Sequence, residues 1–354
     1  ILLRKMWAYG IRGPAHDWFA SYLNNRKQYV YLDNIESQMA DIKHGVPQGS
    51  ILGPLLFLLY VNDISNVMPN LKIKLFADDT NLFLYNKNIS DLFENANAAL
   101  KNLGLWFSAN KLSLNVEKTN YCIFKKSNFA QTVSYPNLKI NNSSITRVSS
   151  TKYLGVLLDD LLTFKDHVNS IVAKISTFCG IFFKLRNRLP ATFLKTIYFS
   201  MIFPHLIYGI EIYANTVISN LNPLMKMNNK ILRILQFKPL LYPVVKLYEN
   251  FDTLQIPKLR DFNIICLVHN VIHNAPELPE IYHNYFTSNL TIYSHNTRGS
   301  RDLHMSFSRS NTGKRNIKIL GCKLWNQIPK SLKCIKSHPV FKRKIKLFVK
   351  NDSS

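Results

Sequence analysis

Hydrophobic and polar residues alternate with different periods along the chain, and each period predicts an element. Ile1 to Tyr9 and a segment starting near Pro14 show helical spacing. Arg26 to Leu32 and Ser37 to Lys43 alternate as strands do, on either side of the turn-forming pair Asp33-Asn34. The first forty residues therefore predict two helices followed by a β-hairpin.

The clearest period-two pattern surrounds a pair of adjacent acids. Lys72 to Leu75 alternates polar with apolar residues, and Asn81 to Tyr85 is rich in strand formers. Phe76, Ala77, Asp78 and Asp79 lie between these runs. The pattern predicts a β-hairpin that carries both carboxylates at its tip.

Helical and strand-like segments flank this hairpin. Ile51 to Val61 is strongly apolar; Ser50 can cap this predicted helix, and its Pro54 falls in the first turn. After the hairpin, apolar residues recur at helical spacing from Leu92 to Phe107. The pattern then predicts a strand, a short hairpin and a second strand, over 112–124, 128–150 and 153–159.

From Phe164 onward the pattern becomes helical. Val168, Ile171, Ile175 and Phe182 recur at the spacing of one helix face, and lysine and arginine occupy the other face. Further helices are predicted over 193–213 and 224–235. The first contains the longest apolar stretch, but Lys195, Pro204, His205 and Glu211 interrupt it, so a buried helix is expected rather than a spanning one of ~20 apolar residues.

Composition limits the partners that this chain can have. The 354 residues are 47% hydrophobic, which suffices for a sizeable core, and the formal net charge is +24. Such an excess of lysine and arginine favours a polyanion, because these side chains replace the counterions around phosphates. The five cysteines form no Cys-x-x-Cys pair, which is typical of unpaired thiols in a reducing compartment.

Two adjacent aspartates on a tight turn repel each other unless a cation lies between them. Oxygen ligands on a short turn suit Mg²⁺, with Mn²⁺ as the alternative ion, because Mg²⁺ binds through one or two carboxylates plus substrate phosphates. Two such ions could stabilise the attacking and leaving oxygens of a phosphoryl transfer. The alternative for an isolated pair is a solvated Asp-Asp turn.

Several ordered motifs decide between these alternatives. They are Gly45 to Ser50, Leu52 to Phe57, Tyr60 to Ile64, Phe76 to Asp79, Trp106, Asn110 to Leu112, Leu114-Asn115, Lys118-Thr119 and Tyr153 to Val156. In this order the chain resembles the reverse transcriptases of non-LTR (LINE-like) retrotransposons, most closely the insect jockey-type branch. The resemblance implies an RNA-directed DNA polymerase that uses two-metal nucleotidyl transfer.

The resemblance also implies roles for single residues. Asp78 and Asp79 would bind the metal, and Lys118 would assist departure of pyrophosphate; the alternative for Lys118 is an ordinary surface lysine. The loop would contact the incoming nucleotide and template, with Gln48 as its main contact; the alternative is a plain turn before a core helix. The loop residues are Gly45, Pro47, Gln48, Gly49 and Ser50.

Tyr153, Leu154 and Gly155 would form the primer grip that holds the growing 3′ end, unless this segment is only a packing strand. Implied partners are an RNA template, a DNA primer and deoxynucleoside triphosphates, without a membrane. An intracellular location, in a cytoplasmic ribonucleoprotein and the nucleus, is expected from the family.

The C-terminal region resembles the same elements in His295, Thr297-Arg298, Leu324 to Asn326, Pro329, Phe341-Lys342 and Lys346. Its lysine-rich end predicts sequence-independent binding to phosphates. Zinc is not expected, because Cys322, Cys334 and His338 lack knuckle spacing and His269 with His273 lacks the glutamate of His-Glu-x-x-His.

The expected fold class is α+β: a partial polymerase palm, with an antiparallel sheet backed by helices, followed by a helical thumb and a mostly helical C-terminal region. The corresponding domains are residues 1–160, 161–245 and 246–354. The family places a third metal-binding aspartate on a strand before the stretch matched by Leu2 to Gly13, and Asp17, Asp33 and Asp41 lack its context. A truncated chain that does not polymerise is therefore expected, and a catalytically dead nucleic-acid-binding remnant is the alternative.

Overall fold

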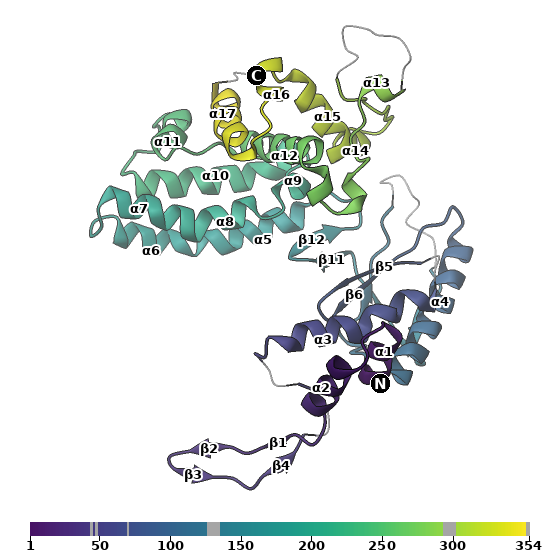
Figure 1. Cartoon of the computed structure of the whole chain (residues 1–354). Coiled ribbons are helices and arrows are strands. Elements are labelled where there is room, and N and C mark those ends of the chain that lie inside the picture. Colours follow the sequence, from purple (N-terminus) through teal and green to yellow (C-terminus); the bar gives the residue numbers. More distant parts are fainter. Residues whose placement is uncertain (43–44, 47–48, 69–70, 126–134, 293–301, 352–354) are drawn as a thin grey trace. The chain divides into compact units, whose positions relative to one another are not determined.

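The computed structural model describes residues 1–42, 45–46, 49–68, 71–125, 135–292 and 302–351 (Figure 1). The chain forms two compact units. The first comprises Ile1–Tyr121 with Asn128–Val148, and the second comprises Cys122–Ser127 with Ser149–Ser354. The chain therefore leaves the first unit, returns to it and leaves it again before the second unit is complete.

Helices supply most of the regular secondary structure of the first unit. Its α-helices are α1 (Leu2–Ala8), α2 (Pro14–Leu23), α3 (Leu52–Val61) and α4 (Ile89–Ala109). A 3₁₀ helix, Asn62–Val67, follows α3 directly and packs on α4, while α1 packs on both α2 and α3. The helices predicted from the apolar spacing are confirmed, including the one that ends at Asn110.

Strands of the first unit pair only in twos within the described part of the chain. Three antiparallel pairs join β1 (Lys27–Gln28) to β4 (Ala40–Asp41), β2 (Tyr31–Leu32) to β3 (Ile35–Glu36), and β8 (Lys139–Ile140) to β9 (Ser143–Ser144). A fourth joins β5 (Lys72–Phe76) to β6 (Asp79–Phe83), and β7 (Asn120–Tyr121) runs parallel to β10 (Thr146–Arg147). The hairpins predicted around Asp33-Asn34, around the acidic pair and within 128–150 are present, but no larger antiparallel sheet forms in this part.

The strand predicted over 112–124 is wrong for most of its length. Only Asn120–Tyr121 is a strand. The Asn115 side chain accepts a hydrogen bond from the Lys118 backbone N–H at 3.2 Å, and its carbonyl accepts one from the Thr119 hydroxyl at 2.8 Å. Asparagine competes for backbone groups in this way, and a turn therefore replaces the first part of the predicted strand.

A second correction concerns residues 153–159, which were predicted as one strand. They belong to a hairpin in the second unit, formed by β11 (Ser150–Tyr153) and β12 (Val156–Asp159). Leu154 and Gly155 form its turn with φ of 45° and 86°. Positive φ at both central residues is the type I′ pattern, whose twist matches that of the paired strands.

The rest of the second unit is helical. Its α-helices are α5 (Lys165–Ser176), α6 (Phe178–Leu185), α7 (Ala191–Ile197), α8 (Phe203–Ile207), α9 (Ile210–Tyr213), α10 (Ile218–Leu235), α11 (Val244–Asn250), α12 (Ile256–His273), α13 (Asn289–Ile292), α14 (Asn311–Lys314), α15 (Ile317–Gln327), α16 (Lys330–Lys333) and α17 (His338–Asn351). Figure 1 shows α5, α8 and α10 running side by side, with α12 and α17 on the other side of α10.

The apolar segment over 193–213 is not one helix as predicted. It is divided among α7, a π-helical segment (Tyr198–Ile202), α8 and α9. Pro204 lies in the first turn of α8, and Gly209 separates α8 from α9 with a φ of 67°. Proline lacks the N–H that a helix interior needs, and the run from Ala191 to Ile207 passes through the π-helical segment just before it. The helical geometry ends at Tyr208 and Gly209. The next helix, α10, begins at Ile218, earlier than predicted, and continues through Pro223.

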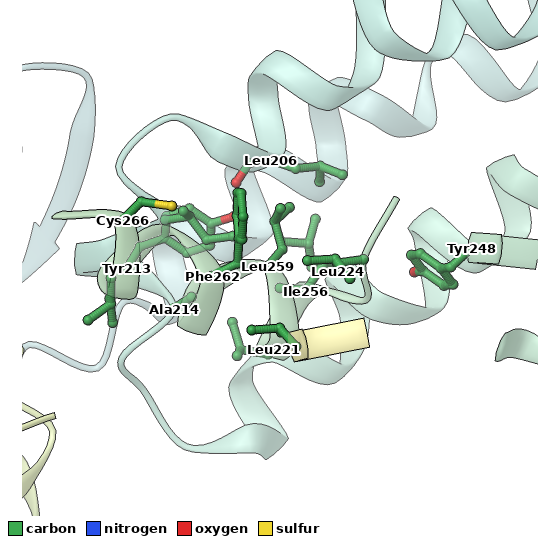
Figure 2. Packing of buried hydrophobic residues seen from close by; sticks show 14 of the residues in the cluster. Leu206, Tyr213, Ala214, Leu221, Leu224, Tyr248, Ile256, Leu259, Phe262 and Cys266 are labelled. Atoms are coloured by element: carbon green, nitrogen blue, oxygen red, sulfur yellow. The ribbon is translucent and has the colours of Figure 1, made fainter. Parts of the chain in front are cut away.

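One hydrophobic core extends through the second unit, from Val156 to Val349. Figure 2 shows how Leu206, Tyr213 and Leu224 of α8, α9 and α10 gather around Ile256, Leu259 and Phe262 of α12. Helix α12 also packs on α15 and α17, so residues 246–354 bury their apolar side chains against residues 161–245. The division of this unit into a thumb and a C-terminal region stays a prediction.

One helical stretch in the described residues, 165–185, is long and apolar enough by length and composition to cross a membrane. Core helices meet the same criterion. In this stretch Val168, Ile171, Ile175 and Phe182 are buried in the core. Ile181 and Phe183 of the same stretch are exposed, so core packing accounts for part of its apolar character.

Candidate active site

The acidic pair lies at the tip of the β5–β6 hairpin. Phe76 pairs with Asp79 as the last rung of the ladder, and Ala77 and Asp78 form the two-residue turn. Ala77 has a φ of 50°, whereas Asp78 is not in the positive-φ region. A positive φ at the first central residue alone is the type II′ pattern, in which glycine is the usual residue. The regular antiparallel pairing of β5 and β6 therefore holds two consecutive carboxylates at the end of the hairpin.

Both carboxylates are exposed to solvent. Neither forms a hydrogen bond or ion pair in the part of the chain that the structure describes. Two exposed carboxylates suit a hard divalent cation that keeps several waters, as Mg²⁺ does. Within the described residues, however, no group of three or more His, Cys, Asp or Glu side chains could hold a metal ion, so this pair supplies part of a coordination shell.

The loop before α3 turns at two glycines. Gly45 and Gly49 have φ of 77° and 83°, and no atom would lie within 4 Å of an added Cβ at either position. Their positive φ, rather than crowding, therefore favours glycine here. Pro47 and Gln48, the predicted centre of the loop, lie outside the described residues.

Ser50 closes this loop onto α3. Its hydroxyl accepts a hydrogen bond from the backbone N–H of Gly53 at 3.1 Å, which satisfies one of the unpaired donors of the first helical turn. The capping role predicted for Ser50 is confirmed. On the other side of the loop, the guanidinium of Arg26 donates a hydrogen bond to the carbonyl of Gly45. This link ties the loop to the β1–β4 hairpin and was not expected from the sequence.

Lys118 is exposed in the turn that precedes β7. The Asn115 side chain holds its backbone N–H, so the position of the residue is fixed by a local turn. No ion pair of the described residues involves the Lys118 ammonium group. The side chain is therefore available to an anionic ligand.

The turn of the β11–β12 hairpin is held by a tyrosine from the helical part of its unit. The hydroxyl of Tyr208 donates a 2.6 Å hydrogen bond to the carbonyl of Leu154. A Cβ on Gly155 would lie 3.0 Å from Cε1 of Tyr208, and one on Gly209 would lie 3.0 Å from Cγ2 of Val156. The predicted primer-grip residues are thus fixed to the corner between α8 and α9.

The structure groups the predicted site residues by unit. Asp78, Asp79, Gly49, Ser50 and Lys118 belong to the first unit, on separate turns. Tyr153, Leu154 and Gly155 belong to the second unit. Of the whole set, Asp78 and Asp79 are adjacent at one tip, and Tyr153 to Gly155 lie together at another.

A half-buried lysine supports the first unit and was missed by the sequence reasoning. Nζ of Lys5 donates to Oδ1 of Asp63 at 2.6 Å and to the carbonyl of Tyr60 at 2.7 Å. It also lies 4.9 Å from the ring centroid of Trp106 and 5.0 Å from that of Tyr60. Tyr60, Asp63 and Trp106 belong to motifs that the sequence had singled out. Their helical spacing did not indicate that all three contact Lys5 of α1.

Comparisons with known proteins agree with this arrangement of motifs. Residues 1–158 match the family described as reverse transcriptase (RNA-dependent DNA polymerase). The chain is 29% identical over 255 residues to the RNA-directed DNA polymerase from the mobile element jockey of Drosophila melanogaster, covering 68% of this chain and 27% of that protein.

Two further relatives extend the comparison. The probable RNA-directed DNA polymerase from transposon X-element of Drosophila melanogaster is 26% identical over 246 residues, covering 65% of this chain and 27% of its own length. The Pol polyprotein from the type-1 retrotransposable element R1 of Bradysia coprophila is 28% identical over 162 residues, covering 45% of this chain and 16% of its own length. The chain thus spans about a quarter, or less, of the length of these three relatives.

Proposed function

We propose that the chain is the nucleotidyl-transfer segment of a non-LTR retrotransposon polymerase, on the premise that residues 1–158 match the reverse transcriptase family, the family expected from the motifs. One observation carries the proposal. Asp78 and Asp79 occupy the exposed tip of a regular hairpin inside the segment that matches the family, and their carboxylates have no partner among the described residues. An ordinary solvated turn can also carry exposed acidic residues. The motifs around this pair match the reverse transcriptase family, and this match favours metal binding over an ordinary turn.

The proposed substrates are an RNA template, a DNA primer and deoxynucleoside triphosphates. Asp78 and Asp79 would hold Mg²⁺ through their carboxylate oxygens, and the ion when bound would stabilise negative charge on the reacting phosphate. Lys118 would offer its ammonium group to the departing pyrophosphate. Gly49 and Ser50 would place backbone N–H groups at the start of α3 near the nucleotide, where the helix dipole favours negative charge.

The second unit would contribute the primer grip and a basic helical surface. The Tyr208 contacts keep the turn of Leu154 and Gly155 rigid, as a clamp on a primer end requires. Lys165, Lys174, Lys184 and Arg188 are exposed on the α5–α6 stretch and its end. Such side chains contact phosphates without reading sequence, which suits a thumb that must follow any duplex.

A second candidate function is nucleic-acid binding without catalysis. The observation that favours it is the donor set, because the described residues offer two carboxylates and no larger cluster of ligands. Losing a group that stabilises a transition state commonly costs a factor of ~10²–10³ in rate. We therefore expect this polypeptide by itself to bind a primed template and to extend it slowly or not at all.

Primer extension on an RNA template separates the two candidates. The chain is incubated with a labelled DNA primer, deoxynucleoside triphosphates and Mg²⁺ or Mn²⁺, and Mn²⁺ binding to the same mixture is followed by electron paramagnetic resonance. Asp78→Asn and Asp79→Asn should each remove bound Mn²⁺ and any extension. Glu94→Gln, which neutralises an exposed carboxylate on α4, should change neither.

The outcomes have distinct meanings. Extension that is lost in both aspartate variants supports the polymerase. Mn²⁺ binding that depends on both aspartates, without extension, supports the metal site in a catalytically incomplete chain. Salt-sensitive binding of the primed template with no aspartate-dependent Mn²⁺ supports the binding remnant. Extension or Mn²⁺ binding that survives in both variants contradicts the role given to Asp78 and Asp79.

A further inference from the structure

Helix α10 ends in a hydrogen-bonding pattern that normally contains glycine. The backbone N–H of Lys238 bonds to the carbonyl of Arg233 at 3.0 Å, and that of Phe237 bonds to Ile234 at 3.4 Å. These two bonds define a Schellman motif, in which Phe237 occupies the left-handed position with a φ of 54°. Glycine takes this conformation without penalty, so a phenylalanine here adopts an unfavourable backbone conformation.

The ring of Phe237 is not buried in compensation. The residue is 54% exposed, as is Phe183 of α6. Arg186 lies against both rings, with its guanidinium carbon 4.0 Å from the centroid of Phe183 and 5.1 Å from that of Phe237. Contact with a guanidinium fixes the orientation of the aromatic surface while one face stays available. An exposed, oriented aromatic ring in a strained position indicates a binding role rather than a packing role.

A cavity of about 380 Å³ adjoins this ring. Its volume lies in the ~300–1,000 Å³ range of small-molecule sites. Figure 1 shows α7, α10 and α11, which supply its walls, together at one end of the second unit. Lysine and amide side chains, and no aspartate or glutamate, are among the residues that line it; those used below are Lys195, Gln236, Phe237, Lys238 and Asn250.

The side-chain amides of Gln236 and Asn250 bond to each other in the cavity in a way that leaves polar atoms of Asn250 for a ligand. Nε2 of Gln236 donates to the carbonyl of Leu247 at 2.8 Å, and Oε1 of Gln236 accepts from Nδ2 of Asn250 at 2.9 Å. The amide of Asn250 is thereby oriented, and its Oδ1 and second N–H remain for a ligand. An asparagine amide with a free acceptor and donor matches the edge of a nucleobase.

We propose that this cavity binds one unpaired nucleotide of a single-stranded nucleic acid. The base stacks on the free face of Phe237, Asn250 hydrogen-bonds to its edge, and Lys195 and Lys238 pair with the flanking phosphates. An aromatic platform beside cationic side chains is the usual arrangement for single strands, because every base has a face that can stack. The inference needs the chain to bind nucleic acid but does not need it to polymerise.

Asp252, which follows the lining residue Phe251, does not oppose this assignment. Asp252 lies just beyond α11, where its Oδ2 is 2.8 Å from Nζ of Lys346 and its Oδ1 is 3.9 Å from Nζ of Lys350. Its charge is therefore compensated by α17. Lys195 also contributes to lowering the pKa of Asp252, after Lys346 and Lys350, and Nζ of Lys238 lies 4.9 Å from the ring centroid of Tyr242. Both lysines keep their positive charge in these contacts and can pair with a polyanion.

The test uses the full chain and fluorescein-labelled twelve-residue oligonucleotides of RNA and DNA, each single-stranded or as a duplex, with binding followed by anisotropy. Phe237→Gly removes the ring at the position where glycine is favoured, so the variant should melt at the same temperature as the native chain or higher. We expect it to bind the single strands roughly tenfold more weakly, the size of one lost base–aromatic stack. Binding to the duplexes should not change.

Phe307→Gly is the matched control, since Phe307 is 86% exposed in the same unit and does not line the cavity. It should leave all affinities unchanged. Phe237→Asn is a second variant that tolerates the left-handed conformation, and it should reproduce the loss. Lys238→Gln should reduce the salt slope of single-strand binding by about 0.7, the contribution of one phosphate contact.

Native-like single-strand affinity in both Phe237 variants would overturn the inference, and so would an equal loss on single strands and duplexes. A folded native chain that binds none of the oligonucleotides would overturn the inference together with the proposed function. If the chain binds duplexes and the Phe237 variants keep the native single-strand affinity, the nucleotide site in the cavity is wrong, while the proposed function stands.

Discussion

Nζ of Lys5 and Oδ1 of Asp63 lie 2.6 Å apart, across fifty-eight residues of sequence. The Lys5 side chain is 12% exposed and the Asp63 side chain 31%. The ammonium group also donates to the Tyr60 carbonyl and lies against the Trp106 ring. A single cation thereby joins α1 to α3, to the 3₁₀ helix that follows α3, and to α4. It supports the part of the first unit from which the acidic hairpin extends.

Replacing this cation should weaken the first unit. Lys5→Ala leaves the Asp63 carboxylate without its partner and should lower the free energy of unfolding by about 1.5–3 kcal/mol, the range for hydrogen bonds to charged groups. Urea denaturation followed by tryptophan fluorescence measures the change, because Trp7, Trp18 and Trp106 all belong to this unit. Lys101→Ala, at an exposed position of α4, should change the stability by less than about 0.5 kcal/mol. Equal effects of the two substitutions would refute the role of Lys5.

The Gly155 turn should not accept a larger residue. Gly155→Ala requires φ near 86° for alanine and places Cβ 3.0 Å from the Tyr208 ring. We expect a loss of about 1–2 kcal/mol, the cost of a left-handed residue, plus the effect of the contact. Gly180→Ala is the control: no atom lies within 4 Å of its added Cβ, and alanine in helix α6 should stabilise by roughly 0.5–1 kcal/mol. Thermal unfolding followed by circular dichroism should therefore shift in opposite directions.

Neutralising the acidic pair should not damage the fold. Asp78 and Asp79 are exposed and unpaired in the described structure, so Asp78→Asn and Asp79→Asn should change the free energy of unfolding by less than about 0.5 kcal/mol. Differential scanning calorimetry without divalent ions measures this directly. A loss above 2 kcal/mol in either variant would mean that the pair has a structural role, and losses of Mn²⁺ binding or extension would then have another explanation.

Acid should destabilise the second unit through His269. Its side chain is buried, with Nε2 2.6 Å from the Ile335 carbonyl and Nδ1 3.3 Å from Nδ1 of His338. Burial is the main cause that lowers the pKa of His269; the Ile335 carbonyl raises it, and the neighbouring His273 and His338 lower it. Burial, followed by the charge of Lys342, also lowers the pKa of His338.

The sign of the effect follows from these directions. A histidine with a lowered folded pKa takes up a proton in the unfolded chain first, so stability is constant above the unfolded value of ~6.5 and falls as the pH decreases below it. The slope reaches about 1.4 kcal/mol per pH unit for one histidine. Urea titrations between pH 5 and 8 test this. His269→Gln should flatten the profile, and the exposed His283→Gln should preserve it. An unchanged profile in His269→Gln would contradict the assignment.

Local sequence signals located most elements correctly. Strict alternation on both sides of Asp78-Asp79 predicted the hairpin, and helical spacing from Leu92 to Phe107 predicted α4. Ser50 before an apolar run predicted a cap, which its bond to Gly53 confirms. In each case the deciding interactions lie within a few residues of one another.

The failures arose where a turn interrupts an otherwise continuous pattern. Residues 153–159 alternate well enough for one strand, yet Leu154 and Gly155 reverse the chain between β11 and β12. The glycine was the available signal, and its neighbour Leu154 gave no warning because leucine rarely adopts a positive φ. Residues 112–115 failed similarly, since Asn115 diverts the backbone into a turn.

Long-range pairs could not be predicted at all. Lys5 with Asp63, Arg26 with Gly45 and Tyr208 with Leu154 are each chosen by tertiary packing. The sequence singled out a motif residue at one end of each pair, Asp63, Gly45 and Leu154, without indicating what it contacts. Roles of Asp78, Asp79 and Lys118 in chemistry stay predictions, because their side chains face solvent and the ligand that would organise them is external.

The path of the chain between its two units has a practical consequence for dissecting this protein. Cys122 to Lys125 belong to the helical unit, although residues of the other unit lie before and after them. The backbone N–H of Lys125 bonds to the carbonyl of Asp160, and Sγ of Cys122 lies 3.9 Å from the carbonyl of Ser149. A single cut after Val148 would therefore remove residues 122–125 from the helical unit and leave them attached to the fragment that contains the first unit. Separating the two units would need a circularly permuted gene or a grafted linker. Truncations should be designed so that residues 122–125 stay with the helical unit.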